Sequence, residues 1–250
     1  MKKIIILVLC VLGASLIYLG KLHYDSKIAA AGKSSSEIPV EENIDLTKLT
    51  KNLSEDMNLI IQNKINNNET INILIVGSNA LVASNIELSW PSLLEQKLIE
   101  NYGEGIFKLQ VENLKFVSTN VFIETDSIKK LLEEKQDIII FEPLLLNDNG
   151  FVRIEDSLRN LSSIIDVILK EQHDTYLILQ PANPILNAPI YEEQVNELKD
   201  YAQENSIEYF NHWEIWPVGE EVGDYLEGDF PNEQGHQLWA DYFINYFISK

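Results

Sequence analysis

Three short, almost wholly apolar runs, separated by stretches with helical periodicity, constrain the fold of this chain more than any other feature. The runs cover residues 71–76, 138–141 and 176–179, and each has the length of a β-strand. Strands that are apolar on both sides must be covered on both faces, and the intervening helices supply that cover. The pattern therefore predicts an α/β protein with a mostly parallel sheet between two layers of helices, a three-layer α/β/α sandwich.

Weaker patterns complete the predicted sheet and its cover. Residues 107–111 alternate between apolar and polar side chains, and residues 207–210 form a short mixed run, so the predicted sheet has five strands. Helical periodicity extends over residues 91–102, 127–134, 154–170, 191–203 and 233–248. Ligand sites of parallel sheets form beyond the carboxyl ends of the strands, so the segments that directly follow the strands are the candidates for function.

The first residues of the chain predict a membrane anchor. Lys2 and Lys3 precede an apolar run over residues 4–19, close to the roughly 17–25 residues that a bilayer span needs. Basic residues before such a run keep the N-terminus in the cytoplasm, so the rest of the chain would lie outside it. The alternative is a signal peptide cleaved at the alanines of residues 29–31, but charged residues separate them from the apolar run, which fits cleavage poorly. We therefore expect residues 1–20 to remain as a single-pass anchor in the cell membrane.

Between the predicted anchor and the globular domain, the sequence indicates a linker and one amphipathic helix. Residues 21–43 contain three consecutive serines and mixed charges without a periodic apolar face, as linkers do. Apolar residues then recur at steps of three to five through residues 44–68, which predicts a helix with Asp45 as its N-terminal cap. The members of this apolar stripe are Leu46, Leu49, Leu53, Met57, Ile60 and Ile65. The globular domain is predicted to cover residues 69–250.

The charge balance and the scarcity of metal-binding residues argue against several function classes. The chain has 39 acidic and 19 basic residues, a formal net charge of −20, which opposes binding to nucleic acid. The four histidines are scattered and Cys10 is the one cysteine, so neither a metal site nor an intrachain disulfide is predicted. No glycine-rich phosphate loop is present, so no nucleotide cofactor is expected.

Three short motifs follow predicted strands or lie near the C-terminus. Residues 77–81 read Gly-Ser-Asn-Ala-Leu, residues 145–148 read Leu-Leu-Asn-Asp, and residues 227–236 read Glu-Gly-Asp-Phe-Pro-Asn-Glu-Gln-Gly-His. In order and spacing they resemble the Gly-Asp-Ser-Leu, Gly-x-Asn-Asp and Asp-x-x-His-Pro-Asn-x-x-Gly-His blocks of the SGNH/GDSL hydrolases. The resemblance runs from about residue 72 to the C-terminus and implies a flavodoxin-like sandwich. It also implies ester hydrolysis by a serine, a histidine and a carboxylate, with amide donors for the oxyanion.

The catalytic positions of that family are altered in this chain. The nucleophile position holds Asn79, which cannot form an acyl-enzyme, and the family's preceding aspartate is Ser78. The family's histidine falls on Phe230, which has no proton chemistry. Its catalytic aspartate falls on Glu227, which is a conservative exchange. The resemblance therefore places the family's triad on positions that lack both the nucleophile and the base.

Two oxyanion-hole candidates and one displaced triad remain. Asn147 matches the family's asparagine, whose side-chain amide suits an oxyanion donor, and Ser118 is the nearest candidate for the missing glycine donor. A displaced catalytic set of Ser78, His236 and Asp229 is the alternative. Each of these three has a more ordinary interpretation, respectively as a turn residue, a packed histidine and an exposed loop carboxylate.

The sequence leaves two functions open. The first is a membrane-anchored, extracytoplasmic ester hydrolase that acts on an O-acyl carbohydrate or a lipid, which the resemblance, Asn147 and the predicted export indicate. The second is a catalytically inactive protein that binds an envelope glycan, lipid or protein partner, because serine and histidine are absent where the chemistry needs them. Enzymatic activity stays open, and no cofactor is expected in either case.

Overall fold

The computed structural model describes residues 46–124 and 127–249, which all lie within one compact unit, Ile44–Lys250. The predicted anchor at residues 1–20, the linker at residues 21–43 and the predicted cap Asp45 lie outside the described residues. Within the described ranges, no helix is both long enough and apolar enough to cross a membrane.

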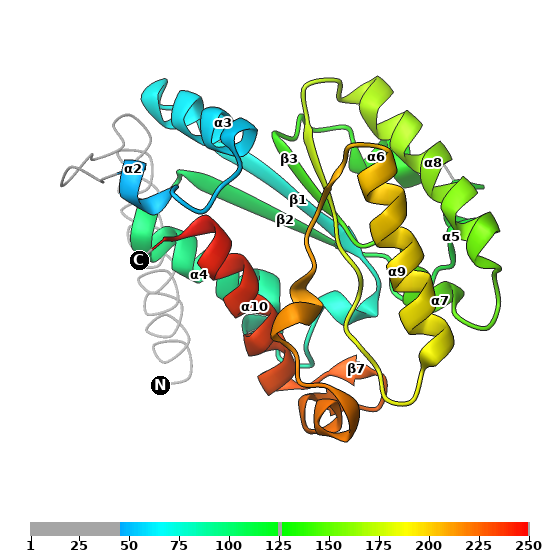
Figure 1. Cartoon of the computed structure of the whole chain (residues 1–250). Helices are drawn as coiled ribbons and strands as arrows, with labels where there is room; N and C mark the ends of the chain where they lie inside the picture. The colour runs from blue at the N-terminus through cyan, green and yellow to red at the C-terminus, as the bar shows by residue number, and fades with distance from the viewer. Residues whose placement is uncertain (1–45, 125–126, 250) are drawn as a thin grey trace, which may run out of the picture. The chain divides into compact units, whose positions relative to one another are not determined.

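The centre of the described unit is a five-stranded sheet in which every strand pair is parallel (Figure 1). The strand order is β2-β1-β3-β4-β5. The first strand, β1, thus lies next to the edge strand β2, and β3, β4 and β5 are added in turn on the other side of β1. The strands are β1 (Ile71–Gly77), β2 (Phe107–Asn113), β3 (Ile138–Phe141), β4 (Tyr176–Leu179) and β5 (Glu208–Tyr209). All five predicted strands are confirmed, although the predicted strand at 207–210 pairs over two residues only.

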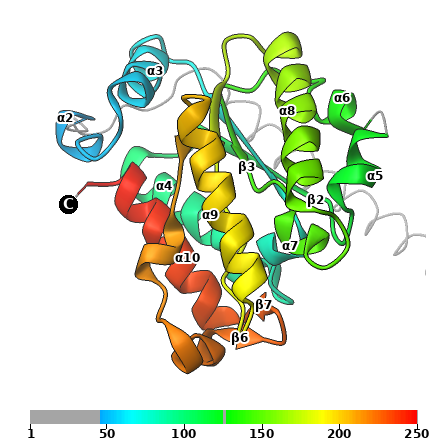
Figure 2. The same cartoon turned by 45° about the vertical axis from the view of Figure 1, so that its right-hand side comes forward.

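Helices cover both faces of the sheet, which confirms the predicted three layers (Figures 1 and 2). One face is covered by α3 (Glu55–Asn66), α4 (Trp90–Tyr102) and α10 (Glu233–Phe247). The other face carries α5 (Thr119–Ile123), α6 (Ser127–Leu131), α7 (Leu145–Asp148), α8 (Ile154–Glu171) and α9 (Pro189–Glu204). A separate hairpin of β6 (Leu226–Glu227) and β7 (Phe230–Pro231) precedes α10.

The alternation of side chains along the strands explains why the runs are apolar throughout. Ile73 and Ile75 of β1 pack towards α4 and α10, whereas Leu74 and Val76 pack towards α8 and α9. Successive residues of a strand point to opposite faces, so a strand covered on both sides is apolar at nearly every position, and the one polar residue of β1, Asn72, lies near its start. Fully burying each such side chain stabilises the fold by about 1.5–3 kcal/mol.

The segment 44–68 is two helices rather than the single helix that the apolar stripe predicts. α2 (Leu46–Leu49) ends before Ser54, which caps α3 by accepting the N–H of Met57 at 3.4 Å. The same serine is fixed to the domain, because its hydroxyl bonds that of Tyr176 at 2.9 Å and its N–H donates to the hydroxyl of Tyr246 at 3.3 Å. A serine with these partners starts a new helix instead of continuing the previous one. The stripe nonetheless packs on the domain: Leu53 and Met57 are buried and the other four members are half-buried, while the second buried residue of α3 is Ile61.

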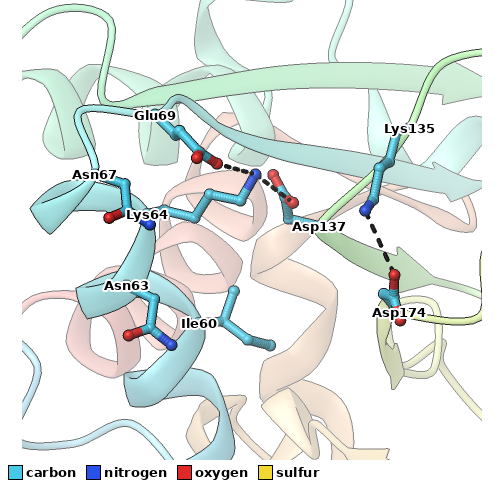
Figure 3. Close-up of a pocket in the computed structure, with 8 residues that line it drawn as sticks. All are labelled: Ile60, Asn63, Lys64, Asn67, Glu69, Lys135, Asp137 and Asp174. Carbon is cyan, nitrogen blue, oxygen red and sulfur yellow. Dashed lines mark ion pairs between the residues drawn. The ribbon is translucent and has the colours of Figure 1, made fainter.

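Charged side chains attach the end of α3 to the amino-terminal edge of the sheet (Figure 3). Lys64 Nζ lies 2.9 Å from Asp137 Oδ1 and 3.2 Å from Glu69 Oε2, and the bond to Asp137 raises the pKa of Lys64. Lys135 pairs with Asp174 at 3.5 Å across the same cavity of about 280 Å³. Both lysines of this cavity are therefore paired with carboxylates, and the cavity lies opposite the edge where parallel sheets form their sites.

Candidate active site

The candidate active site lies at the carboxyl ends of β1, β2 and β3, where segments distant in the sequence meet. A short turn of helix, η1 (Asn79–Leu81), follows β1, and the β6–β7 hairpin contacts it. At the end of β2, Asn113 Nδ2 donates to Asn79 Oδ1 at 3.3 Å. Asn147 is carried by α7, directly after β3. The three sequence motifs thus reach the same edge of the sheet, as the parallel topology requires.

Asn147, an oxyanion donor that the resemblance predicts, is bonded to the chain's own backbone, and so is the N–H at the nucleophile position, Asn79. The N–H of Asn79 donates to the carbonyl oxygen of Lys115 at 3.1 Å. Asn147 Nδ2 donates to the same oxygen at 2.9 Å and to the carbonyl oxygen of Val117 at 2.8 Å. Lys115 adopts the left-handed conformation, with φ +56°, and its N–H is held by Asn113 Oδ1 at 2.7 Å. A backbone carbonyl therefore occupies the place where these donors would receive a substrate oxygen.

Ser78 faces inward and is bonded to a buried carboxylate. The serine is fully buried, and its N–H donates to Glu142 Oε2 at 2.5 Å. The Ser78 hydroxyl accepts the N–H of Ala80 at 3.3 Å, the bond of an ordinary helix cap. Glu142 is also fully buried, and its second oxygen accepts the N–H of Leu144 at 2.9 Å. Burial raises the pKa of Glu142, and the hydrogen bonds from Ser78 and Leu144 oppose that shift.

His236 is a buried residue at the start of α10. Its Nδ1 accepts the backbone N–H of Trp90 at 3.4 Å, and its Nε2 has no partner among the described residues. Burial lowers the pKa of His236 to about 4. Neutral imidazole is therefore its stable form at physiological pH, and the ring bonds the first residue of helix α4.

His212 is likewise held in the core. Its Nδ1 accepts the indole N–H of Trp216 at 3.0 Å, which leaves Nε2 to donate to the carbonyl of Pro181 at 3.0 Å. The imidazole stacks on Trp239 with ring centroids 4.2 Å apart. Burial lowers its pKa to about 3. These contacts are those of a structural histidine.

The hairpin places the family's carboxylate and histidine positions opposite each other. Glu227 and Phe230 are paired across the antiparallel β6–β7 ladder, and Gly228 in the connecting loop has φ +65°. A directly paired position brings two side chains within reach of each other. In this chain the ring of Phe230 instead meets that of Phe116, with centroids 5.8 Å apart, and Phe116 is 68% exposed. An aromatic pair thus stands where a histidine would act.

The displaced set of Ser78, His236 and Asp229 has no hydrogen bond between any two of its members in the described part of the chain. Ser78 and His236 are both buried with separate partners. Asp229 is exposed, and its backbone oxygen accepts from Asn183 Nδ2 at 3.0 Å. Among residues 46–124 and 127–249, no group of three or more His, Cys, Asp or Glu residues could hold a metal ion.

The remaining candidates have structural contacts. Ser118 occupies the cap position of α5 but makes no side-chain cap bond. Asp148, next to Asn147, is fully buried and accepts three hydrogen bonds. Thr119 donates its N–H at 2.9 Å and its hydroxyl at 2.6 Å, and Ser157 donates its hydroxyl at 2.6 Å. The two polar residues of the second motif therefore differ in role. Asn147 faces the site, and Asp148 joins α7 to α5 and α8 by hydrogen bonds.

Two contributors to the site were missed by reasoning from the sequence. Glu142 directly follows a fully apolar strand, a position where a buried acid is unusual, and that placement was the available signal. Lys115 contributes a backbone carbonyl, so its side chain carries no signal. The one signal for the tight loop at residues 113–115 is Asn113, because an asparagine side chain often bonds the backbone N–H two residues further along the chain, as it does here.

Replacing His236 by phenylalanine is expected to make the fold less sensitive to acid. The folded pKa of about 4 lies below the unfolded value near 6.5, so the stabilising contribution of the neutral ring is complete above pH 6.5 and is lost as the pH falls towards 4. In that window the unfolded chain binds one proton more, and the free energy of unfolding falls by about 1.4 kcal/mol per pH unit. Urea denaturation at several pH values gives the slope of the free energy of unfolding against pH, and between pH 4 and 6.5 this slope should be smaller in His236→Phe by the equivalent of one proton.

The matched control for this measurement is His173→Phe, because the side chain of His173 is 79% exposed. That variant should keep the slope of the wild type. Equal slopes in the wild type and in His236→Phe would contradict the buried, neutral state of His236.

Comparisons with known proteins agree on the fold. No protein-family model matches the sequence, and neither does any curated protein. A protein assigned to the lipolytic G-D-S-L family from Desulfitobacterium hafniense superposes with a TM-score of 0.56 at 18% identity, covering 70% of this chain and 98% of that one. A GDSL-like lipase from Parabacteroides merdae gives 0.59 at 13% identity, covering 71% and 95%. The psychrotrophic esterase EstA from Pseudoalteromonas gives 0.55 at 17% identity, covering 70% and 95%.

The similarity in structure therefore agrees with the three motifs at the sheet edge. At these identities it establishes the architecture and leaves the chemistry to the residues of this chain. The described part of this chain has the fold of the SGNH/GDSL hydrolases.

Proposed function

We propose that this chain is a non-hydrolytic SGNH-fold protein that binds a component of the cell envelope. The observation that carries the proposal is the carbonyl oxygen of Lys115, which accepts bonds from both Asn79 N–H and Asn147 Nδ2. Ester hydrolysis needs those donors free to hold an oxyanion, and losing one such donor alone typically slows catalysis by about 10²–10³. In this chain the donors are already satisfied.

The residues at the nucleophile and base positions support the same proposal. The amide of Asn79 cannot take up an acyl group, and the ring of Phe230 cannot accept a proton. The two buried histidines point to other partners, and the Ser78 hydroxyl is bonded to Ala80 in its own turn and to the buried Glu142. A non-catalytic role thus requires no rearrangement of the site.

The location of the protein is part of the proposal. Lys2 and Lys3 before the apolar run over residues 4–19 support a single-pass anchor that leaves the SGNH-fold domain outside the cytoplasm. An envelope glycan, lipid or protein is then the partner that the domain can reach. Protease added to intact cells should degrade the domain, and protection of the domain would contradict the external location.

Hydrolysis of an envelope ester is the second candidate function. It is favoured by the retained Asn147 and by Glu227, which faces the base position across the hairpin. Either residue could serve in catalysis only after the Lys115 carbonyl had moved and another group had supplied the nucleophile.

The experiment that separates the two functions is ester hydrolysis by the full chain in mild detergent. With p-nitrophenyl acetate and with an alkyl fluorophosphonate probe, we expect no turnover above buffer and no labelling, whereas an active esterase of the same fold reacts with both. Ser78→Ala is the matched variant. Turnover or labelling that disappears in Ser78→Ala would overturn the non-hydrolytic assignment and would identify Ser78 as a nucleophile.

A further inference from the structure

A second cavity opens at the same edge of the sheet, beside the candidate active site. It has a volume of about 530 Å³ and lies between the segment that follows β4, residues 184–189, and the segment that follows β5, residues 213–222. The size is within the usual range of small-molecule sites. Both views show the start of α9 and the β6–β7 hairpin at this end of the sheet (Figures 1 and 2). The residues placed in the candidate active site do not line the cavity.

Tryptophans form the rigid part of the cavity wall. Trp213 donates its indole N–H to the carbonyl of Ala182 at 2.6 Å, and Trp216 donates its own to His212 Nδ1 at 3.0 Å. Both indoles are thus fixed by the protein and have no donor left for a ligand. Trp216 is buried, so the ring surface that a ligand can reach is mainly that of the half-buried Trp213. Val218, which is 86% exposed, extends the apolar surface.

The polar part of the lining is acidic. Glu192, in the first turn of α9, and Glu220 both line the cavity, and both are exposed. No lysine or arginine lines it, and no ion pair joins either carboxylate to a cation within residues 46–124 and 127–249. Two amide side chains, Asn187 and Asn196, complete the polar groups. An anion would meet repulsion in this cavity, whereas a cation would be attracted by both carboxylates.

We propose that this cavity binds an organic cation, an ammonium group carried on an apolar body. Aromatic ring faces attract ammonium groups, and quaternary ammonium compounds are recognised by aromatic walls in this way. The carboxylates of Glu192 and Glu220 supply the opposite charge, and the apolar lining accepts the alkyl groups. The proposal gives the proposed binding function a ligand class, and it uses a cavity separate from the altered catalytic positions.

The test is a calorimetric titration of the full chain with choline and with 3,3-dimethylbutan-1-ol, which has the same shape without the charge. Choline should bind, and the neutral alcohol should bind at least about tenfold more weakly, because the carboxylates contribute only to the cation. Glu192→Gln and Glu220→Gln should each weaken choline binding several-fold. Glu193→Gln is the matched control, because Glu193 is the next residue of α9 and lines a different cavity; it should leave binding unchanged.

Glycerophosphocholine distinguishes the two possible sources of the ammonium group, a lipid headgroup and a free organic cation. Binding as tight as that of choline would identify a lipid headgroup, and weaker binding would identify a free cation, so both results support an ammonium site. Equal affinity for choline and the neutral alcohol, no binding of choline, or equal effects of Glu192→Gln and Glu193→Gln would overturn the proposal. Ester turnover in the same preparation would contradict the non-hydrolytic assignment alone, so the two failures can be told apart.

Discussion

Replacing Glu142 by alanine is expected to lower the free energy of unfolding by about 4 kcal/mol, because two buried N–H groups lose their acceptor at about 1–3 kcal/mol each. Those groups are the amides of Ser78, at 2.5 Å, and of Leu144, at 2.9 Å. Leu144 has φ +64°, a conformation that costs a non-glycine residue energy and that the bond to Glu142 helps to hold. Urea denaturation with a constant slope against denaturant measures the loss.

Glu142→Gln separates the shape of the side chain from its charge. The amide keeps the volume but presents an NH₂ group to one of the two N–H donors. We therefore expect the free energy of unfolding of Glu142→Gln to lie between that of the wild type and that of Glu142→Ala. Glu227→Ala removes an exposed carboxylate and should stay within about 0.5 kcal/mol of the wild type. If Glu142→Ala also stayed within that margin, the two bonds would not support the site.

The pH dependence of this difference has a definite sign. Burial raises the folded pKa of Glu142 above its unfolded value, so its contribution is complete below the unfolded pKa and is lost as the pH rises through the folded pKa. Glutamine does not titrate. The stability gap between the wild type and Glu142→Gln should therefore be largest in acid and should shrink as the pH rises.

The same carboxylate explains why residue 77 is glycine. A Cβ at Gly77 would lie 2.7 Å from Glu142 Oε2 and 2.8 Å from Glu142 Cβ, closer than real Cβ atoms approach. The glycine in the first motif therefore serves the packing of two strand ends. A motif that resembles a catalytic block thus has a structural role in this chain.

The fold could be predicted because its signals are local. Three of the five strands, β1, β3 and β4, could be located because they are almost wholly apolar, a pattern that needs no tertiary information. The prediction of one helix over residues 44–68 was wrong because Ser54 is fixed by Tyr176 and Tyr246, which are far away in the sequence. The apolar periodicity of a segment indicates which of its faces is buried, but it gives no information on hydrogen-bond partners that are distant in the sequence.

The site was predictable only as far as side chains define it. The motifs located Asn79, Asn147 and Phe230, and the structure brings the segments that carry them together. The carbonyl of Lys115 could not be predicted, because every residue has a carbonyl and its direction depends on the φ of a single loop position. The part of the site that sequence reasoning missed is therefore a backbone conformation.

Restoring a serine and a histidine, as Asn79→Ser with Phe230→His, is expected to give at most weak ester hydrolysis. The double variant would have a nucleophile at the end of β1 and a base opposite Glu227 in the hairpin. The backbone N–H of residue 79 and Asn147 Nδ2 would still bond the Lys115 carbonyl at the distances of the wild type. The developing oxyanion would then lack its donors, although the triad chemistry would be present.

Adding Lys115→Pro to the double variant should raise kcat by about 10²-fold, the typical value of one oxyanion donor. Proline fixes φ near −65°, so residue 115 could not keep its φ of +56°, and the carbonyl would have to leave the two donors. Lys115→Ala in the same background is the control, because alanine removes the side chain without forbidding that φ, and it should leave kcat unchanged. A Lys115→Pro triple variant no faster than the double variant would show that the occupied donors are not what prevents catalysis, and the replaced nucleophile and base would then carry the proposed loss of activity alone.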